Sequence, residues 1–173
     1  LSWHVEKARQ AEAESDLISM TEAANKMERC CYYKQAWKTF QAIAMLEKPS
    51  PGRPWRGPCD RVRTLVVEGR KRDLGDELRL VHLVAKAAAD VSELIVQTEE
   101  RLIPLFQRSF PYVRFISTND ALPQDNDTAW TTYEQLALFY AHNEELILNS
   151  FLPLIPPPAS AINPRGLGIS WYS

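Results

Sequence analysis

Apolar residues between positions 73 and 110 recur with the spacing of an α-helix. The recurring positions, separated by steps of three or four residues, are Leu80, Val84, Ala87, Val91, Leu94, Thr98, Leu102 and Leu105. Leu83, Val96 and Ile103 widen this apolar stripe, so the helix would need neighbours on most of its sides. Pro104 has no backbone N–H to donate, which predicts a kink or a restart there. The pattern therefore predicts a long amphipathic helix at the centre of a bundle.

The first 47 residues contain neither proline nor glycine, and their apolar positions also follow mostly helical spacing. The part before Leu17 is richer in charge and alanine. Ser19 and Glu22 have the spacing of a capping box, which marks the start of a helix. We therefore expect a helical extension over residues 1–18 and a first bundle helix after it. On that helix Trp37 and Phe40 lie on the same face as Cys30 and are expected to supply much of its burial, with Cys30 as a small buried apolar residue.

The stretch 48–58 interrupts this helical pattern. It holds four prolines and two glycines, which excludes regular helix and predicts a loop. A shorter helix is expected from residue 60 to about residue 72. The residues from 112 to 127 are irregular and are expected to form a loop. Within them, 112–116 has an extended pattern but no evident strand partner.

A last helix is expected from residues 127–131 to about residue 154. Thr131 and Glu134 again have capping-box spacing, which supports a start in that range. The proline run at 156–158 ends the helix. The tail beyond it retains more apolar residues than a solvated linker normally does.

Together these elements predict a single all-α domain. The chain has 173 residues, 45% hydrophobic and 24% charged, which is the composition of a globular domain rather than of a disordered chain. The expected fold is a bundle of about four helices with up-down topology, a Pro/Arg-rich loop and a Pro-rich C-terminal arm. The corresponding division is a helical extension over 1–18, a bundle domain over 19–155 and an extended arm over 156–173.

Positive charge is concentrated between residues 48 and 72. This segment has eight basic and two acidic residues, whereas the whole chain has a formal net charge of −2. Arginine pairs well with phosphate, and an exposed tryptophan can stack on a nucleobase. The candidate polyanion contacts are Lys48, Arg53, Trp55, Arg56, Arg61, Arg63, Arg70, Lys71 and Arg72. No recognised nucleic-acid-binding module accompanies them, so contact with RNA or DNA, for instance within a ribonucleoprotein, is the alternative function.

The sequence contains no recognisable catalytic or metal-binding motif. Nucleophile-elbow and Walker-type sequences are absent. The soft metal ligands lack the Cys-x-x-Cys or His-x-x-x-His spacing of a zinc site; they are Cys30, Cys31, Cys59, His4, His82 and His142. We therefore expect a protein that is not an enzyme and has no metal, cofactor or small-molecule substrate.

The longest apolar run, residues 146–158, is interrupted by polar residues and prolines and is shorter than the roughly 20 residues that span a bilayer. No transmembrane segment is predicted. The first residues lack an initiator Met and the order of a secretory signal, as expected of a processed or internal start. Three cysteines do not form an even disulfide framework, which favours a reducing compartment such as the cytoplasm or nucleus. An organelle reached after removal of a presequence is the alternative.

The wide apolar stripe, the apolar tail and the lack of a catalytic motif favour a structural or adaptor subunit of a larger assembly. Such a subunit would bind other proteins through helix faces and extended arms. The candidate partner contacts are Leu83, Val96, Ile103, Ile162, Leu167, Ile169, Trp171 and Tyr172. The proline runs could act as rigid spacers, as arms that embrace neighbours, or as extended ligands for an aromatic groove. No motif in the chain identifies a family.

Overall fold

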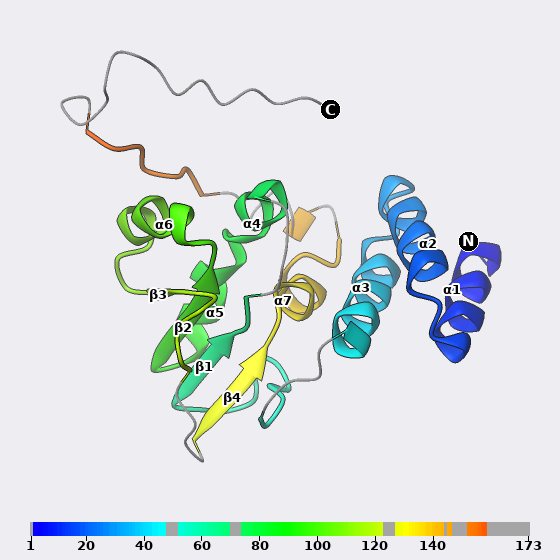
Figure 1. Ribbon diagram of the computed structural model, residues 1–173, viewed down its shortest axis with the longest axis horizontal. Coiled ribbons are helices and arrows are strands. Elements are labelled where there is room, and N and C mark those ends of the chain that lie inside the picture. The colour runs from blue at the N-terminus through cyan, green and yellow to red at the C-terminus, as the bar shows by residue number, and fades with distance from the viewer. Residues whose placement is uncertain are drawn as a thin grey trace.

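The computed structural model describes residues 2–47, 52–69, 74–122, 127–143, 145–146 and 152–158. These residues form a mixed α/β fold, in which three N-terminal helices lie beside a parallel sheet and its covering helices (Figure 1). The predicted all-α helical bundle is therefore wrong. Lys48 and the basic residues 70–72 lie outside the described residues, as does the tail from 159 onward.

Four parallel strands form the sheet within the described residues. They are β1 (Thr64–Val67), β2 (Glu93–Thr98), β3 (Arg114–Ser117) and β4 (Thr128–Thr131), in the spatial order β3-β2-β1-β4. Val66 of β1 is in register with Ile95 of β2 on one side and with Trp130 of β4 on the other. The chain therefore runs outward from β1 to β3 and then returns to the opposite side of β1 for β4.

Two of the strands occupy segments in which the sequence predicts helix. β1 lies in the predicted helix 60–72, and β2 lies in the middle of the predicted helix 73–110. Apart from Glu93, both strands are buried along their whole length, so their apolar residues form continuous runs instead of alternating with polar ones. A short continuous run of apolar residues is compatible with the apolar stripe of a helix and also with a buried strand. Periodicity alone therefore does not distinguish the two.

The predicted long helix is instead a series of short elements on either side of β2. They are α4 (Leu74–Leu80), α5 (Leu83–Asp90), the 3-10 turn η1 (Glu100–Leu102) and α6 (Ile103–Ser109). Val91 has an extended backbone, with φ −135° and ψ 159°, and ends α5. Pro104 lies in the first turn of α6, where a missing N–H removes no helical bond, so the predicted restart at this proline is confirmed.

The C-terminal half of the sheet brings further corrections. The extended pattern at 112–116 belongs to β3, and its partner is β2. β4 takes up the start of the predicted last helix, and α7 (Tyr133–Tyr140) follows it directly. The N-cap of α7 is Thr132, whose Oγ1 accepts the N–H of Gln135 at 3.3 Å, rather than Thr131. Residues 152–158 have no regular structure, so the predicted helix does not reach residue 154.

The sheet separates two unequal parts of the core. Leu65 and Val67 face a large apolar cluster to which α4, α5, α6 and α7 all contribute, whereas Val66 faces a small cluster with Ile95 and Trp130. Burying a side chain of this size stabilises the fold by about 1.5–3 kcal/mol. The large cluster therefore provides most of the stabilisation that holds these helices on the sheet.

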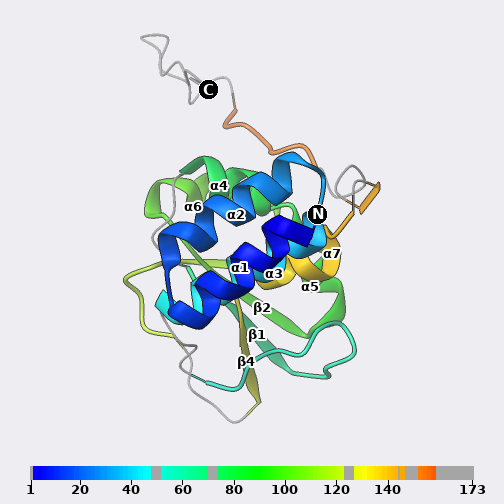
Figure 2. The same ribbon diagram turned by 90° about the vertical axis from the view of Figure 1, so that its right-hand side faces the viewer.

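The N-terminal helices form a second layer, called here the helical layer: α1 (Ser2–Glu14), α2 (Leu17–Arg29) and α3 (Tyr33–Glu47). In it α1 packs on α2 and α2 on α3, and α3 packs on α7 (Figure 2). The break predicted near residue 18 lies at the turn between α1 and α2, where Asp16, not Ser19, is the N-cap. A second turn at Cys31, with a left-handed φ of +61°, was not predicted.

The division of the chain at residues 18 and 155 stays a prediction. No helix among the described residues has the length and apolarity needed to cross a bilayer.

Candidate functional site

A groove of about 790 Å³ opens on the helical layer between α1 and α3. Its lining residues are Val5, Glu6, Ala8, Arg9 and Glu12 of α1, Met27 of α2, and Gln35, Lys38 and Thr39 of α3. This volume lies within the roughly 300–1,000 Å³ that is typical of small-molecule pockets in proteins. None of these residues is among the predicted site residues, so sequence reasoning missed the groove entirely.

The groove has its shape because small side chains line the contact between the helices. Ala8, Ala23 and Ala36 form one apolar cluster with Met27, and all four are at most 5% exposed. Alanine lets helix backbones approach closely but fills little space above the contact, so the floor stays apolar and open. The signal in the sequence is the alanine-rich character of the first 44 residues, which indicates close helix packing but not a groove.

The two rims of the groove differ in charge. Glu6, Arg9 and Glu12 are exposed on the α1 side, and Lys38 is exposed on the α3 side. The Nη1 of Arg9 lies 3.7 Å from a carboxylate oxygen of Glu6, with both side chains more than 70% exposed. An exposed ion pair of this kind contributes about 0–1 kcal/mol to stability, so its side chains can rearrange at little cost when a ligand binds. The α1 rim is net negative and faces a positive rim on α3.

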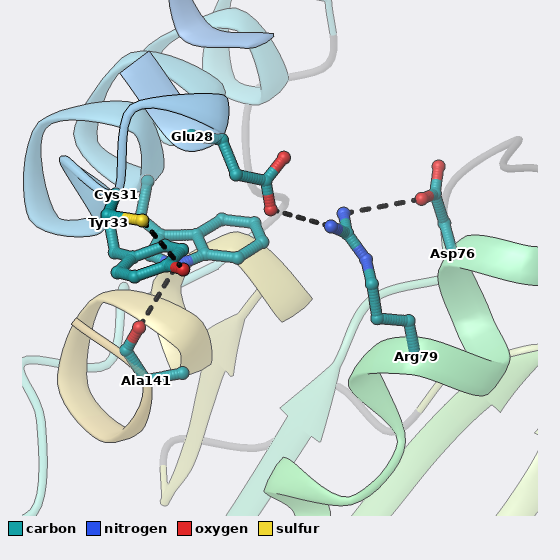
Figure 3. Close-up of polar contacts among 7 residues, drawn as sticks. Glu28, Cys31, Tyr33, Asp76, Arg79 and Ala141 are labelled. Carbon is teal, nitrogen blue, oxygen red and sulfur yellow. Dashed lines mark hydrogen bonds and ion pairs between the residues drawn. The ribbon is translucent and has the colours of Figure 1, made fainter. Parts of the chain in front are cut away.

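The opposite side of α3 fixes the helical layer to the rest of the molecule (Figure 3). The indole Nε1 of Trp37, which is 4% exposed, donates to the carbonyl oxygen of Ala141 at 3.1 Å. Arg79 of α4 reaches Glu28 of α2 at 2.6 Å and Asp76 at 3.4 Å, and its guanidinium lies 5.5 Å from the centre of the Trp37 ring. These contacts fix α2 and α3, two of the three helices that line the groove, to the rest of the molecule.

The turn that starts α2 shows how the α1 rim is positioned. The Asp16 carboxylate accepts the N–H of Ser19 at 3.2 Å and so caps α2. Hydrogen bonds from Ser19 to this carboxylate lower the pKa of Asp16 below its ordinary value of 3.8. Ser15, just before it, has a left-handed φ of 56° that reverses the chain. These two residues set the direction in which α1 runs along α2.

Buried acidic residues gather at the carboxyl edge of the sheet. Glu68 directly follows β1 and Glu134 opens α7 after β4, at the point where the strand order reverses; they are 1% and 6% exposed. Glu77 of α4 accepts hydrogen bonds from the Thr98 hydroxyl and, at 3.1 Å, from the N–H of Glu99. Glu77 thus ties α4 to the end of β2. Among the described residues, no three His, Cys, Asp or Glu side chains are placed to hold a metal ion.

The described part of the chain holds five of the nine predicted polyanion contacts, namely Arg53, Trp55, Arg56, Arg61 and Arg63. Arg56, Arg61 and Arg63 are exposed before the amino end of β1, whereas Arg70, Lys71 and Arg72 follow its carboxyl end and lie outside the described residues, with Lys48. β1 therefore separates the two groups of basic residues in the sequence.

Two residues of the predicted polyanion site are already engaged within the fold. Arg53 pairs with Asp60 at 2.5 Å. Burial acts against the ionised Asp60, yet the N–H of Arg56 and the guanidinium of Arg53 still hold its pKa below the ordinary value. Trp55 is 1% exposed and packs edge-on against Phe139, with ring centres 5.3 Å apart. The predicted stacking of Trp55 on a base is therefore corrected: its ring is part of the core.

The predicted partner contacts within the described residues also belong to the core or pack against it. Leu83 and Val96 are 3% and 0% exposed inside the large apolar cluster, and Ile103 packs against it half-buried. These side chains were expected on an uncovered edge of a helix, but the sheet and helices cover them. Ile162, Leu167, Ile169, Trp171 and Tyr172 lie outside the described residues.

The cysteines are free and exposed, at Cys30, Cys31 and Cys59. The expectation of a small buried Cys30 on the Trp37 face is thus wrong, because the chain turns at residues 30–32 and α2 ends before it. The hydroxyl of Tyr33 lies 3.5 Å from the Cys31 sulfur (Figure 3).

Comparisons with family models, with curated proteins and with solved structures found no match to this chain.

Proposed function

We propose that the chain is a non-catalytic adaptor that binds a helical segment of a partner protein in the groove between α1 and α3. The observation that supports this most is the build of the groove, with an apolar floor between rims of opposite charge. An amphipathic helix matches such a groove, because its apolar stripe covers the floor while its polar flanks meet the rims. The contact would remove apolar surface from water on both sides, which favours binding.

The dimensions and charges of the groove also restrict the length of the partner helix and the placement of its charged residues. Its lining residues on α1 extend from Val5 to Glu12, which is about two helical turns or about 10 Å of helix. Glu6 already has Arg9 beside it, so Glu12 is the better position for a basic side chain of the partner helix. An acidic side chain of the partner helix would lie near Lys38. The charges thus favour one orientation of the partner helix across the groove.

A display library of helical peptides, selected on the full chain, tests this proposal. We expect the selected peptides to carry apolar residues at helical spacing, flanked by one basic and one acidic side. Gln35→Trp places a large side chain in the groove and should weaken their binding by about tenfold or more. Lys34→Trp adds the same ring one residue away, outside the groove lining, and should change binding by less than about twofold. Equal binding to wild type and to both variants would refute the groove as the site.

Contact with RNA or DNA through residues 48–72 is the second candidate. It draws support from the exposed side chains of Arg56, Arg61 and Arg63. If these contact phosphates, binding to duplex DNA should weaken with salt, with a log–log slope of about 0.9 per neutralised phosphate. Reversal of Arg61 and Arg63 to Glu should then abolish binding. Retained affinity in that double variant would remove this candidate.

A further inference from the structure

Residues 152–158, with the sequence Leu-Pro-Leu-Ile-Pro-Pro-Pro, form a short exposed segment, the orange ribbon in Figure 1. Leu152 and Ile155 are 43% and 50% exposed, although both are large and apolar. All four prolines are exposed as well.

The sequence of this segment dictates an extended conformation. Proline fixes φ near about −65°, and four of the seven residues are proline. A residue that precedes proline is driven out of the helical region towards extended backbone, which applies to Leu152, Ile155, Pro156 and Pro157. The combination favours a polyproline II helix, with three residues per turn and no internal hydrogen bonds.

Backbone hydrogen bonds hold this segment to the body of the protein, and Leu154 packs half-buried against the large apolar cluster. The N–H of Leu152 donates to Nδ1 of His82 at 3.1 Å, and the N–H of Ile155 donates to the Ser109 hydroxyl at 2.8 Å. The Nε of Arg108 donates to the carbonyl of Ile155 at 3.4 Å. Because the contacts engage backbone groups, the proline rings stay exposed to solvent.

We infer that residues 152–158 are a ligand for a partner domain that recognises polyproline II helices in an aromatic-lined groove. Pro153 and Pro156 are three residues apart, so their rings lie one above the other on one side of the helix, the spacing read by such domains. The prolines restrict the backbone of the segment, and two hydrogen bonds anchor it, which lowers the conformational entropy lost on binding. Arg108 adds a positive charge beside Ile155, so an acidic side chain next to the partner's aromatic groove fits this surface.

This surface is separate from the groove of the helical layer, and the inference does not rest on the proposed function. The segment is anchored by α6 and by His82 before α5, whereas the groove lies between α1 and α3. A variant that blocks one surface should leave binding at the other unchanged. Gln35→Trp is therefore a control for the proline-rich segment.

Isothermal titration calorimetry of the full chain with a panel of purified SH3, WW and EVH1 domains tests the inference. At least one class should bind, and the double substitution Pro153→Ala with Pro156→Ala should weaken that binding by about tenfold or more. Pro111→Ala, at an exposed proline elsewhere, should change it by less than about twofold. Ser109→Ala removes one anchor and should weaken binding several-fold without touching the ligand. Failure of all three classes to bind, or unchanged binding by the double variant, overturns the inference.

Discussion

At the scale of single residues, the contacts that hold the molecule together join positions far apart in the chain. Trp37 is predicted to contribute much of the burial of its helix, and it is buried. Its hydrogen-bond partner, the carbonyl of Ala141, is 104 residues away. No local pattern contains that pairing, because it depends on how α3 packs on α7. The sequence therefore predicts the burial of this side chain but not the hydrogen bond by which it connects α3 to the end of α7.

Replacement of Trp37 by Phe keeps an aromatic ring but removes the indole donor. The Ala141 carbonyl then loses its partner in a buried site, so we expect a loss of about 1–3 kcal/mol in the free energy of unfolding. Urea denaturation measures it. Trp3→Phe, at a side chain that is 61% exposed, should cost less than about 0.5 kcal/mol. Equal losses in the two variants would show that the hydrogen bond from the Trp37 indole to Ala141 does not stabilise the fold.

Tyr140 provides a second test at this scale, through pH. Its hydroxyl donates to a carboxylate oxygen of Asp90 at 2.5 Å. Burial and then this bond raise the pKa of Tyr140 above its ordinary value of 10.0. The stabilisation is fully present below pH 10 and is lost as the pH rises towards the folded pKa, because the unfolded chain releases this proton first.

Above that pH, the free energy of unfolding should therefore fall less steeply for Tyr140→Phe than for the wild type. Chemical denaturation at a series of alkaline pH values measures the difference. Tyr112→Phe removes an exposed tyrosine and should keep the wild-type slope. If Tyr140→Phe also keeps it, the Asp90 contact does not form in solution.

At the scale of elements, the sequence predicts helices well where nothing competes with them. The helical character of the first 47 residues, the turn near residue 18 and the restart at Pro104 are all confirmed. The strands are missed because each central strand is short and lacks a regular alternation of apolar and polar residues. β3 shows the consequence most clearly, since its extended pattern was visible but its partner, β2, was hidden in a predicted helix.

The proline-rich segment at 152–158 should respond to acid at the element scale. Burial lowers the pKa of His82 below its ordinary value of 6.5, and only a ring unprotonated at Nδ1 can accept the N–H of Leu152. A lowered pKa gives stabilisation that is present above pH 6.5 and is lost as the pH falls through the folded value. The segment should therefore detach at residue 152 on acidification.

An NMR titration of the Leu152 amide resonance measures this detachment. The wild type should show a step with its midpoint below pH 6.5, the ordinary value for histidine. His82→Gln supplies an acceptor oxygen that does not titrate there, so it should remove the step. A step of equal size and midpoint in the variant would contradict the role of His82.

At the scale of the whole molecule, the three helices of the helical layer together form a groove that no single helix shows in the sequence. The groove needs α1 and α3, whose lining residues are about 30 positions apart, to flank α2. Its residues are ordinary helix-surface residues when read one helix at a time. The predicted adaptor function thus survives as a proposal, while the side chains predicted to carry it, Leu83 and Val96, belong to the core.

The most direct test of the groove is lysine labelling of the complex between the full chain and its helical partner, read by mass spectrometry. Lys38 lines the groove and Lys34 does not, yet both are exposed on α3 and lie one helical turn apart. The account predicts that Lys38 becomes several-fold less reactive in the complex than in the free chain, while Lys34 reacts equally in both. Unchanged reactivity of Lys38, or protection of Lys34 alone, would contradict it.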